Sequence, residues 1–229
     1  MKRLLIIGLI IASTTMVYAQ DYLGIQIGYA QPTTRLNTPE SKTVLKSTIY
    51  NGFKLGVIYD ATLIKGFGVS MGLNYTYGGN ATDWKKVGTN LYPSLRTKGQ
   101  YHQIELPVDW QYKFQIAKST YIMLYTGPTL QCGLSLQSKN FLNNGKEIQL
   151  TDVDNYYSET DMQDRALKRL NVTWGVGAGL QYERYFIRGG YDFGLINPYQ
   201  LRQFPGEDVY TRGRIDQWQV KVGIYLWQF

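Results

Sequence analysis

The chain has 229 residues, among them 24 glycines, 20 tyrosines and 5 tryptophans, and its formal net charge is +7. Its single cysteine, Cys132, excludes an intramolecular disulfide. The small positive surplus suits contact with phosphate-bearing lipid and predicts no nucleic-acid partner.

The first 19 residues have the pattern of a cleavable secretory signal peptide. Lys2 and Arg3 precede an apolar run from Leu4 to Ala12, and small polar residues lead to Ala19. The run is too short for a spanning helix, which needs about 20 apolar residues. We expect cleavage after Ala19, which leaves a mature domain of residues 20–229 with a net charge of 22 − 17 = +5.

The mature chain contains eight segments in which apolar and polar residues alternate. An exported chain with this composition is either a soluble all-β domain or an outer-membrane β-barrel. Barrel strands need about 9 to 11 residues, whereas soluble strands usually have about 5 to 6. Most of the eight segments have barrel length, and they are residues 22–30, 49–60, 66–78, 100–114, 120–136, 169–184, 185–197 and 214–229.

The two faces of these segments differ in residue size. In the second segment, Phe53, Leu55 and Val57 alternate with Gly52, Lys54 and Gly56. A soluble barrel would turn its large apolar residues inward, whereas the inside of a narrow membrane barrel has room mainly for small or polar ones. We therefore expect the large apolar face to contact lipid.

The connections alternate in length. Residues 61–65 and 115–119 are short links and none separates Arg184 from Tyr185, whereas 31–48, 79–99, 137–168 and 198–213 are long and polar. With eight strands, both termini lie at the end with the short links, which is the periplasmic end of such barrels. The prediction is an all-β fold, a transmembrane antiparallel up-and-down β-barrel of eight strands with short periplasmic turns and long extracellular loops.

Three segments carry a family resemblance: IELPVDWQYKF, YTGPTLQCGLSL and WGVGAGLQYERYFIRGGYDFGLIN. Together with a final strand ending in Phe229, they resemble the PorT-like outer-membrane β-barrel family of Bacteroidota. The resemblance covers nearly the whole mature chain and is most specific over residues 101–229. It implies an eight-stranded barrel in the cell outer membrane. Since the best-known member acts in protein secretion and gliding, it also implies an accessory role in secretion or envelope assembly.

The last segment, VKVGIYLWQF, resembles the C-terminal signal read by the barrel assembly machinery, which implies that machinery as a partner through Phe229. If Val220 and Val222 face lipid, strict alternation turns Tyr225 and Trp227 inward together with Phe229. We expect either a bulge near Gly223 or a position of the last residues at the periplasmic rim.

The inward parity carries four acids and four bases. Because an unpaired charge in a closed interior would cost several kcal/mol, we expect them to pair. The predicted polar network is Lys54, Glu105, Asp109, Arg188, Asp192 and Lys221, with Lys113 and Glu183 on the same face. It is interpreted as an ionic plug; the alternatives are a small-solute channel or a site for one small ligand.

The sole histidine, His102, has lipid-facing parity near the outer end of its segment. A lipid-modifying barrel enzyme would pair such a histidine with a serine or a carboxylate. No serine in a convincing sequence position accompanies it, so we predict a non-catalytic protein without a cofactor. The lipid-modifying enzyme remains the alternative.

The long segments outside the strands suggest partners. In residues 137–168, Asp152 and Asp154 lack the glycine and the terminal glutamate of a calcium loop, so no metal is predicted, whereas Tyr156 and Tyr157 suit an envelope protein partner. The other long loops are basic, and contact with lipopolysaccharide phosphates is expected of them. Their basic residues are Arg35, Lys42, Lys46, Lys85, Lys86, Arg96, Lys98, Arg202 and Arg212.

Pro107 lies in the middle of the segment QIELPVDWQYKF. Proline has no N–H to donate, and a closed barrel has no free edge where this would not matter. We predict a local bulge or a missing ladder bond at Pro107.

Overall fold

A computed structural model describes residues 20–37, 47–64, 66–83, 95–142, 147–148, 168–198 and 212–229. The predicted signal peptide, residues 1–19, lies outside the described part. The strands are β1 (Gln20–Asn37), β2 (Ser47–Ile49), β3 (Asn51–Ile64), β4 (Phe67–Asp83), β5 (Leu95–Ala117), β6 (Thr120–Leu142), β7 (Glu147–Ile148), β8 (Leu170–Tyr182), β9 (Tyr185–Gly194) and β10 (Arg212–Gln228). In these ranges, no helix has the length and apolar character needed to cross a membrane.

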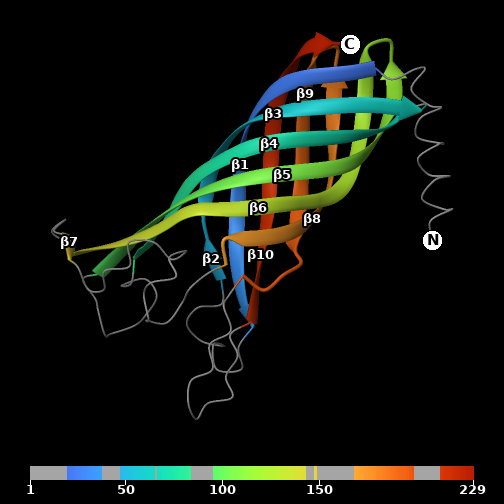
Figure 1. Ribbon diagram of the computed structural model, residues 1–229. Helices are drawn as coiled ribbons and strands as arrows, with labels where there is room; N and C mark the ends of the chain where they lie inside the picture. The colour runs from blue at the N-terminus through green and yellow to red at the C-terminus, as the bar shows by residue number, and fades with distance from the viewer. Residues whose placement is uncertain are drawn as a thin grey trace, which may run out of the picture.

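Eight of the strands form a closed antiparallel ring (Figure 1). The order is β1, β3, β4, β5, β6, β8, β9 and β10, and β10 pairs back onto β1. Closure reaches the end of the chain, where the backbone N–H of Phe229 donates to the carbonyl of Asp21 at 2.9 Å. Strands β2 and β7 lie outside the ring, on β1 and β6. The predicted eight-stranded up-and-down barrel is confirmed.

The two ends of the ring differ in their connections. Gly66, at a φ of +89°, lies in the tight link between β3 and β4, and Glu183, at a φ of 51°, lies in the turn between β8 and β9. The C-terminus lies at this same end (Figure 1). An alanine at Gly66 would place its Cβ 2.4 Å from the carbonyl of Lys113, so only glycine fits this turn. This is the periplasmic end of the predicted orientation.

At the opposite, extracellular end several strands run further than predicted. Strand β1 continues to Asn37, β5 begins at Leu95 and β6 ends at Leu142, so Arg35 and Lys98 lie in strands rather than in loops. In Figure 1, β5 and β6 project well past the end of β8. The prediction stopped short because these extensions lie beyond the apolar band and lack its alternation.

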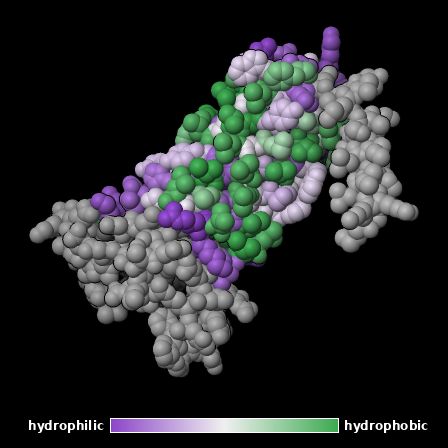
Figure 2. All heavy atoms as spheres, viewed as in Figure 1, coloured by the Kyte–Doolittle hydropathy of each residue, from purple (hydrophilic) through white to green (hydrophobic). Residues whose placement is uncertain are grey.

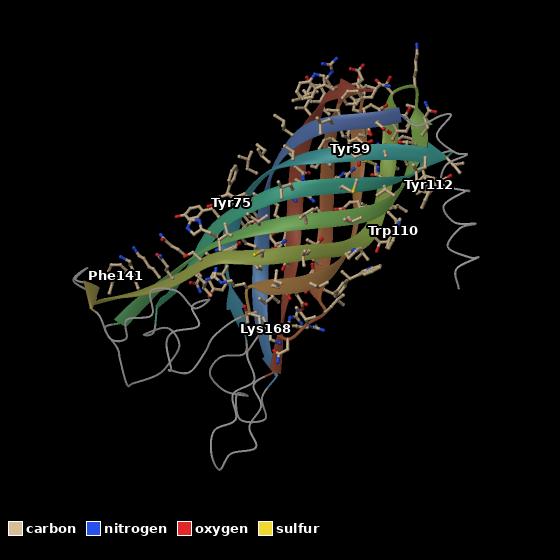
Figure 3. The ribbon with its side chains drawn as sticks, in the orientation of Figure 1. Tyr59, Tyr75, Trp110, Tyr112, Phe141 and Lys168 are labelled. Carbon is tan, nitrogen blue, oxygen red and sulfur yellow. The ribbon has the colours of Figure 1, made fainter. Side chains whose placement is uncertain are left out.

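The outer wall is apolar around its middle. Hydrophobic residues gather over the middle of the barrel and hydrophilic ones toward its two ends (Figure 2). Tyr75 lies toward the end with the long links and Tyr112 toward the end with the short turns (Figure 3). The side chains of Phe53 and Leu55 are 55% and 52% exposed, which is the expected state of residues that contact lipid. The predicted assignment of the two faces therefore agrees with the structure.

Two prolines interrupt the ladders of β5. Pairing is absent between Pro107 and Gly72 on the β4 side, and between Val108 and Pro128 on the β6 side, with no change of register at either place. The predicted missing ladder bond is therefore found at Pro107, and the alternative bulge is not. The pyrrolidine ring of Pro107 is buried on the inner face, where Gly72 leaves room for it.

A bulge does occur in β10, but not near Gly223. The register with β1 shifts between Leu23 and Gly24, which face Trp227 and Tyr225, so Leu226 is the extra residue. Tyr225 is only 3% exposed and points inward, whereas Trp227 is 56% exposed. The bulge thus returns Trp227 to the lipid-facing side after one inward tyrosine.

Candidate functional site

The six residues of the predicted polar network all have buried side chains inside the barrel. Their exposed fractions are 0% for Lys54, 1% for Glu105, 5% for Asp109, 1% for Arg188, 2% for Asp192 and 3% for Lys221. Because successive side chains of a strand alternate between its faces, the small inward residues between them leave space for these long polar ones. The six do not form one cluster. Three of them belong to one group and Arg188 belongs to a second, whereas Asp109 and Lys221 belong to neither.

The first group, which we call the outer network, lies toward the extracellular end. The ammonium group of Lys54 on β3 lies 2.5 Å from a carboxylate oxygen of Glu105 on β5 and donates to Gln219 on β10 at 2.6 Å. The amide of Gln219 donates in turn to Asp192 on β9 at 2.8 Å. Gln217 donates to the same carboxylate at 3.4 Å. The outer network therefore ties together four strands of the ring.

The second group, the periplasmic plug, is built on Arg188 of β9. Its guanidinium donates to Asp60 at 2.8 Å, to Ser70 at 2.9 Å and to Gln111 at 2.9 Å. The ammonium group of Lys113 lies 3.3 Å from the same Asp60 carboxylate. Charge-assisted bonds of this kind are stronger than neutral ones, and several of them fix the side chain in place.

Apolar side chains complete the periplasmic plug. Ile58, Met123, Phe186 and Tyr225 form a buried cluster, and Tyr22 packs against it. The hydroxyl of Tyr225 donates to Asp60 and so connects the apolar cluster to the charged one. The rings of Phe186 and Tyr225 lie 4.7 Å apart. Arg188 is therefore enclosed by apolar side chains as well as by its hydrogen-bond partners.

Asp109 and Lys221 differ from the other predicted members. Both are buried, yet no ion pair of either occurs in the part of the chain that the structure describes. Lys221 is the register partner of Arg188, so two positive charges face each other across the β9–β10 pair. Such like-charged neighbours repel, which disfavours a direct bond between them.

The structure corrects one member of the predicted set of inward charges. Glu183, predicted to point inward, lies in the exposed turn between β8 and β9. Asp60 was missed, although the parity of Gly52, Lys54 and Gly56 continues to it. Among the described residues the buried acids on the inner face are Asp60, Glu105, Asp109 and Asp192, and the buried bases are Lys54, Lys113, Arg188 and Lys221. Four acids therefore face four bases in the lumen, with Asp60 in the place that was predicted for Glu183.

Below the periplasmic plug the lumen opens into a vestibule. Two cavities of about 410 and 480 Å³ share Tyr22, Tyr121 and Gln181 in their walls. Lys113 lines the larger one, and its ammonium group lies 5.2 Å from the ring of Tyr22. The vestibule faces the end with the short turns and is separated from the outer network by the plug.

On the outer wall, His102 is surrounded by aromatic residues. Its Nδ1 lies 2.5 Å from the hydroxyl of Tyr75, and its ring centroid lies 4.9 Å from that of Tyr77. Its register partner on β6 is Ser135, which the sequence analysis did not identify because Ser135 follows a change of register between β5 and β6. The two residues face each other, but no hydrogen bond between them occurs in the described structure.

The predicted partner loop remains untested. Asp152, Asp154, Tyr156 and Tyr157 lie outside the described residues. Within the described ranges, no group of histidine, cysteine or acidic side chains is arranged to hold a metal ion.

Comparison with known proteins gives one family match and several distant structures. Ail, the attachment invasion locus protein of Yersinia pestis, solved with the heparin analogue sucrose octasulfate, is 14% identical; the match covers 93% of this chain and 100% of that one, with a TM-score of 0.39. Neisserial surface protein A is 14% identical, with 89% and 97% coverage and a TM-score of 0.42. The N-terminal β-barrel domain of OprF from Pseudomonas aeruginosa is 12% identical, with 87% and 97% coverage and a TM-score of 0.28. No curated protein matches the chain.

The family match is the informative one. Residues 18–200 match the family described as "Outer membrane protein beta-barrel domain", which is well over half of the chain. The match agrees with the closed ring and its apolar outer wall. The chain therefore belongs to the outer membrane protein beta-barrel domain family, and its place is the cell outer membrane.

Proposed function

We propose that this protein is a closed, non-catalytic barrel that acts through its surfaces, as a structural or interaction protein of the envelope. The observation that supports this proposal most directly is that the side chain of Arg188 reaches across the lumen. Strands β9 and β4 are four steps apart in the ring of eight and so lie opposite each other, yet Arg188 of β9 donates to Ser70 of β4 at 2.9 Å. A side chain that spans the lumen and is held by charged partners leaves no open path at that level.

The resemblance to PorT-like barrels extends this proposal to an accessory role in protein secretion or envelope assembly. A projecting sheet of β5 and β6 supports it. Gln100 on β5 and Gln137 on β6 are register partners with exposed side chains in this projection. Such a sheet offers a partner both a flat face and backbone groups along its edge.

Bilayer conductance tests the closed lumen. We expect purified protein to produce no conductance steps in a planar bilayer under conditions in which a porin does. Steps that change size in the Asp60→Asn variant would show an ion path through the plug and would overturn the proposal.

Site-specific crosslinking tests the interaction role. A photo-crosslinker at Gln137 on the projection should capture an envelope protein in native membranes. The control position is Gln115, an exposed glutamine of the same strand pair at the periplasmic end. Equal capture at both positions, or capture at neither, would contradict a specific partner at the projection.

The lipid-modifying enzyme is a second candidate, because Ser135 faces His102 on the outer wall. The imidazole would act as the base for the serine hydroxyl. Mass spectra of lipid A from cells with wild-type protein, His102→Ala and Ser135→Ala separate the two candidates. Our proposal expects three identical spectra, whereas a species that disappears in both variants would establish the enzyme.

A further inference from the structure

The outer wall carries a buried carboxylate, Asp216, which belongs to neither group in the lumen. Asp216 on β10 pairs in register with Thr33 on β1, and Pro32 with Gln217. Pro32 and Gln217 are buried on the inner parity, so Asp216 points outward. It is nevertheless only 1% exposed. Other side chains on the outside of the barrel must therefore cover it.

Two arginines provide the cover. The Nε atoms of Arg35 on β1 and Arg214 on β10 each lie 3.1 Å from the same oxygen of Asp216. The other carboxylate oxygen accepts the backbone N–H of Gly194 at 3.1 Å. The arginine side chains themselves are 52% and 51% exposed. One buried carboxylate thus anchors two half-exposed guanidinium groups side by side, and the trio has a net charge of +1.

The anchoring leaves the outer parts of the guanidinium groups available. Both arginines approach Asp216 with Nε, and one terminal nitrogen of Arg35 lies 3.4 Å from the hydroxyl of Tyr191. The contacts of both arginines with this Asp216 oxygen are ion pairs without hydrogen-bond geometry. Guanidinium groups that an ion pair already restricts lose less entropy when they bind a planar or tetrahedral oxyanion.

The depth of the pair in the membrane is set by its neighbours. Tyr191 is the register partner of Trp218, whose indole N–H donates to Gln31 at 2.5 Å and whose ring lies 5.2 Å from that of Tyr29. Amphipathic aromatic residues of this kind occupy the level of the lipid head groups. Closer to the periplasmic end, Ile187 and Val220 are 46% and 39% exposed on the apolar wall, where acyl chains lie. Strands β1 and β10 run side by side past the end of β9 (Figure 1).

We propose that Arg35 and Arg214, oriented by Asp216, form a binding site for the phosphate groups of an outer-leaflet phospholipid or glycolipid of the lipid A type. The charge and the forked donors suit phosphate, and the apolar wall directly beneath suits the acyl chains of a lipid rather than free phosphate. The site is independent of the proposed function, since it exists whether the barrel is an interaction protein or an enzyme.

Native mass spectrometry of the full-length protein in detergent tests the site with bisphosphorylated lipid A as the probe. The Arg35→Gln/Arg214→Gln variant should bind about a hundredfold more weakly, at about tenfold for each charged contact. The matched control is Lys118→Gln/Arg184→Gln, which removes two exposed charges at the periplasmic rim. The control should bind as wild type does. Dephosphorylated lipid A should bind wild type as weakly as bisphosphorylated lipid A binds the glutamine variant.

A second variant keeps the test decisive if the first does not fold. Arg35→Lys/Arg214→Lys retains both charges but loses the forked donors, and it should bind about tenfold more weakly than wild type. Unchanged affinity in the arginine variants, an equal loss in the periplasmic control, or equal binding of dephosphorylated lipid A would each overturn the proposal. Displacement of lipid A by millimolar inorganic phosphate would also overturn the assignment to lipid.

Discussion

The two halves of the lumen are filled in different ways. In the periplasmic plug, Arg188 and Asp60 are enclosed by Met123, Phe186 and Tyr225. In the outer network, charged side chains are instead surrounded by other polar ones, as where Gln217 and Gln219 both donate to Asp192. The periplasmic plug is therefore a charged centre inside an apolar shell, whereas the outer network is a chain of hydrogen-bonded amides and charged groups.

This difference indicates that one half of the lumen admits water and the other half excludes it. In the outer half, Gln26 donates to Asn74 at 2.6 Å, which leaves the carbonyl oxygen of Gln26 and the amide nitrogen of Asn74 without a protein partner. Buried polar atoms of this kind are usually satisfied by water. The plug also has such atoms, Nε of Arg188 and the amide nitrogen of Gln111, but its apolar cluster encloses them. Because of this apolar shell, we infer that water enters the outer half and stops at the plug. The plug is then the barrier, and its ion pair should contribute more to stability than the ion pair of the outer network.

The largest effect is expected from Arg188→Met. The change leaves Asp60 charged inside the apolar shell with Lys113 as its remaining cation, 3.3 Å away. Breaking a buried pair from one side typically costs about 3 to 5 kcal/mol in the free energy of unfolding. Urea unfolding of protein in lipid vesicles, followed by tryptophan fluorescence, measures this loss. The double variant Asp60→Asn/Arg188→Met should recover part of the lost free energy of unfolding. If Arg188→Met alone is as stable as wild type, the plug is not the barrier to water.

A smaller effect is expected from Lys54→Met in the outer network. Glu105 loses its cation but keeps hydrogen bonds from Thr76 and Gln103, each at 3.1 Å, and inferred water can solvate it. The expected loss is about 1 to 3 kcal/mol, the cost of one charged hydrogen bond rather than of a dry charge. The same urea experiment compares the two halves directly. A loss as large as that of Arg188→Met would show that the outer half is equally dry.

Two glycine variants compare the packing of the halves without changing any charge. In the plug, a Cβ at Gly223 would lie 2.3 Å from the ring of Phe186 and 2.4 Å from the backbone oxygen of Ile25. In the outer half, a Cβ at Gly175 would meet the end of the Asp192 side chain at 2.6 Å. A carboxylate can rotate away, whereas a packed ring and a backbone cannot. Gly223→Ala should therefore cost about 1 to 3 kcal/mol, a typical penalty for overpacking.

The matched variant Gly175→Ala should cost less than about 1 kcal/mol, because only a flexible side chain must move. Urea midpoints of the two alanine variants give the comparison. Equal losses would mean that Asp192 is fixed as firmly as Phe186, and the outer network would then be as rigid as the plug.

The sequence predicts which residues face the lumen better than it predicts which side chains contact each other inside the lumen. Alternation assigned Lys54 and Glu105 to the inner face because parity along one strand is local information. The partner of Arg188 could not be predicted in this way. Which side chains meet across a lumen depends on the order of strands and on their stagger around the ring, and β9 is separated from β3 and β4 by intervening strands. Asp60 was within reach of the parity argument, which simply ended too early.

Changes of strand register were the second feature that the sequence did not predict. The change of register at Leu226 turns Trp227 outward, and the change between His102 and Gln103 places Ser135 opposite His102. A bulge shifts the parity of every residue after it, and no residue type in these segments marks its position. Pro107 was the exception, because the missing N–H of a proline is a chemical fact of the sequence.

The smallest effect is expected at the boundary between the halves, from Pro107→Ala. Pro107 lies on β5 between Glu105 of the outer network and Gln111 of the plug. The alanine regains an N–H that can bond to the carbonyl of Gly72, which contributes about 0.5 to 1.5 kcal/mol, while the more flexible unfolded chain offsets about 0.4 to 1 kcal/mol of it. We expect a net change in the free energy of unfolding of less than about 1 kcal/mol, because these two contributions oppose each other.

Amide hydrogen exchange distinguishes this near-cancellation from the absence of any new bond. If the new amide at position 107 is protected as strongly as that of Glu105, the carbonyl of Gly72 has regained a donor and the ladder closes between the halves. The matched variant Pro128→Ala should restore the corresponding bond to Val108 on the other side of β5, since pairing there is interrupted in the same way. Fast exchange at both positions would show that the strands are held apart at this level by more than the two prolines, and that water reaches the wall where the outer network ends.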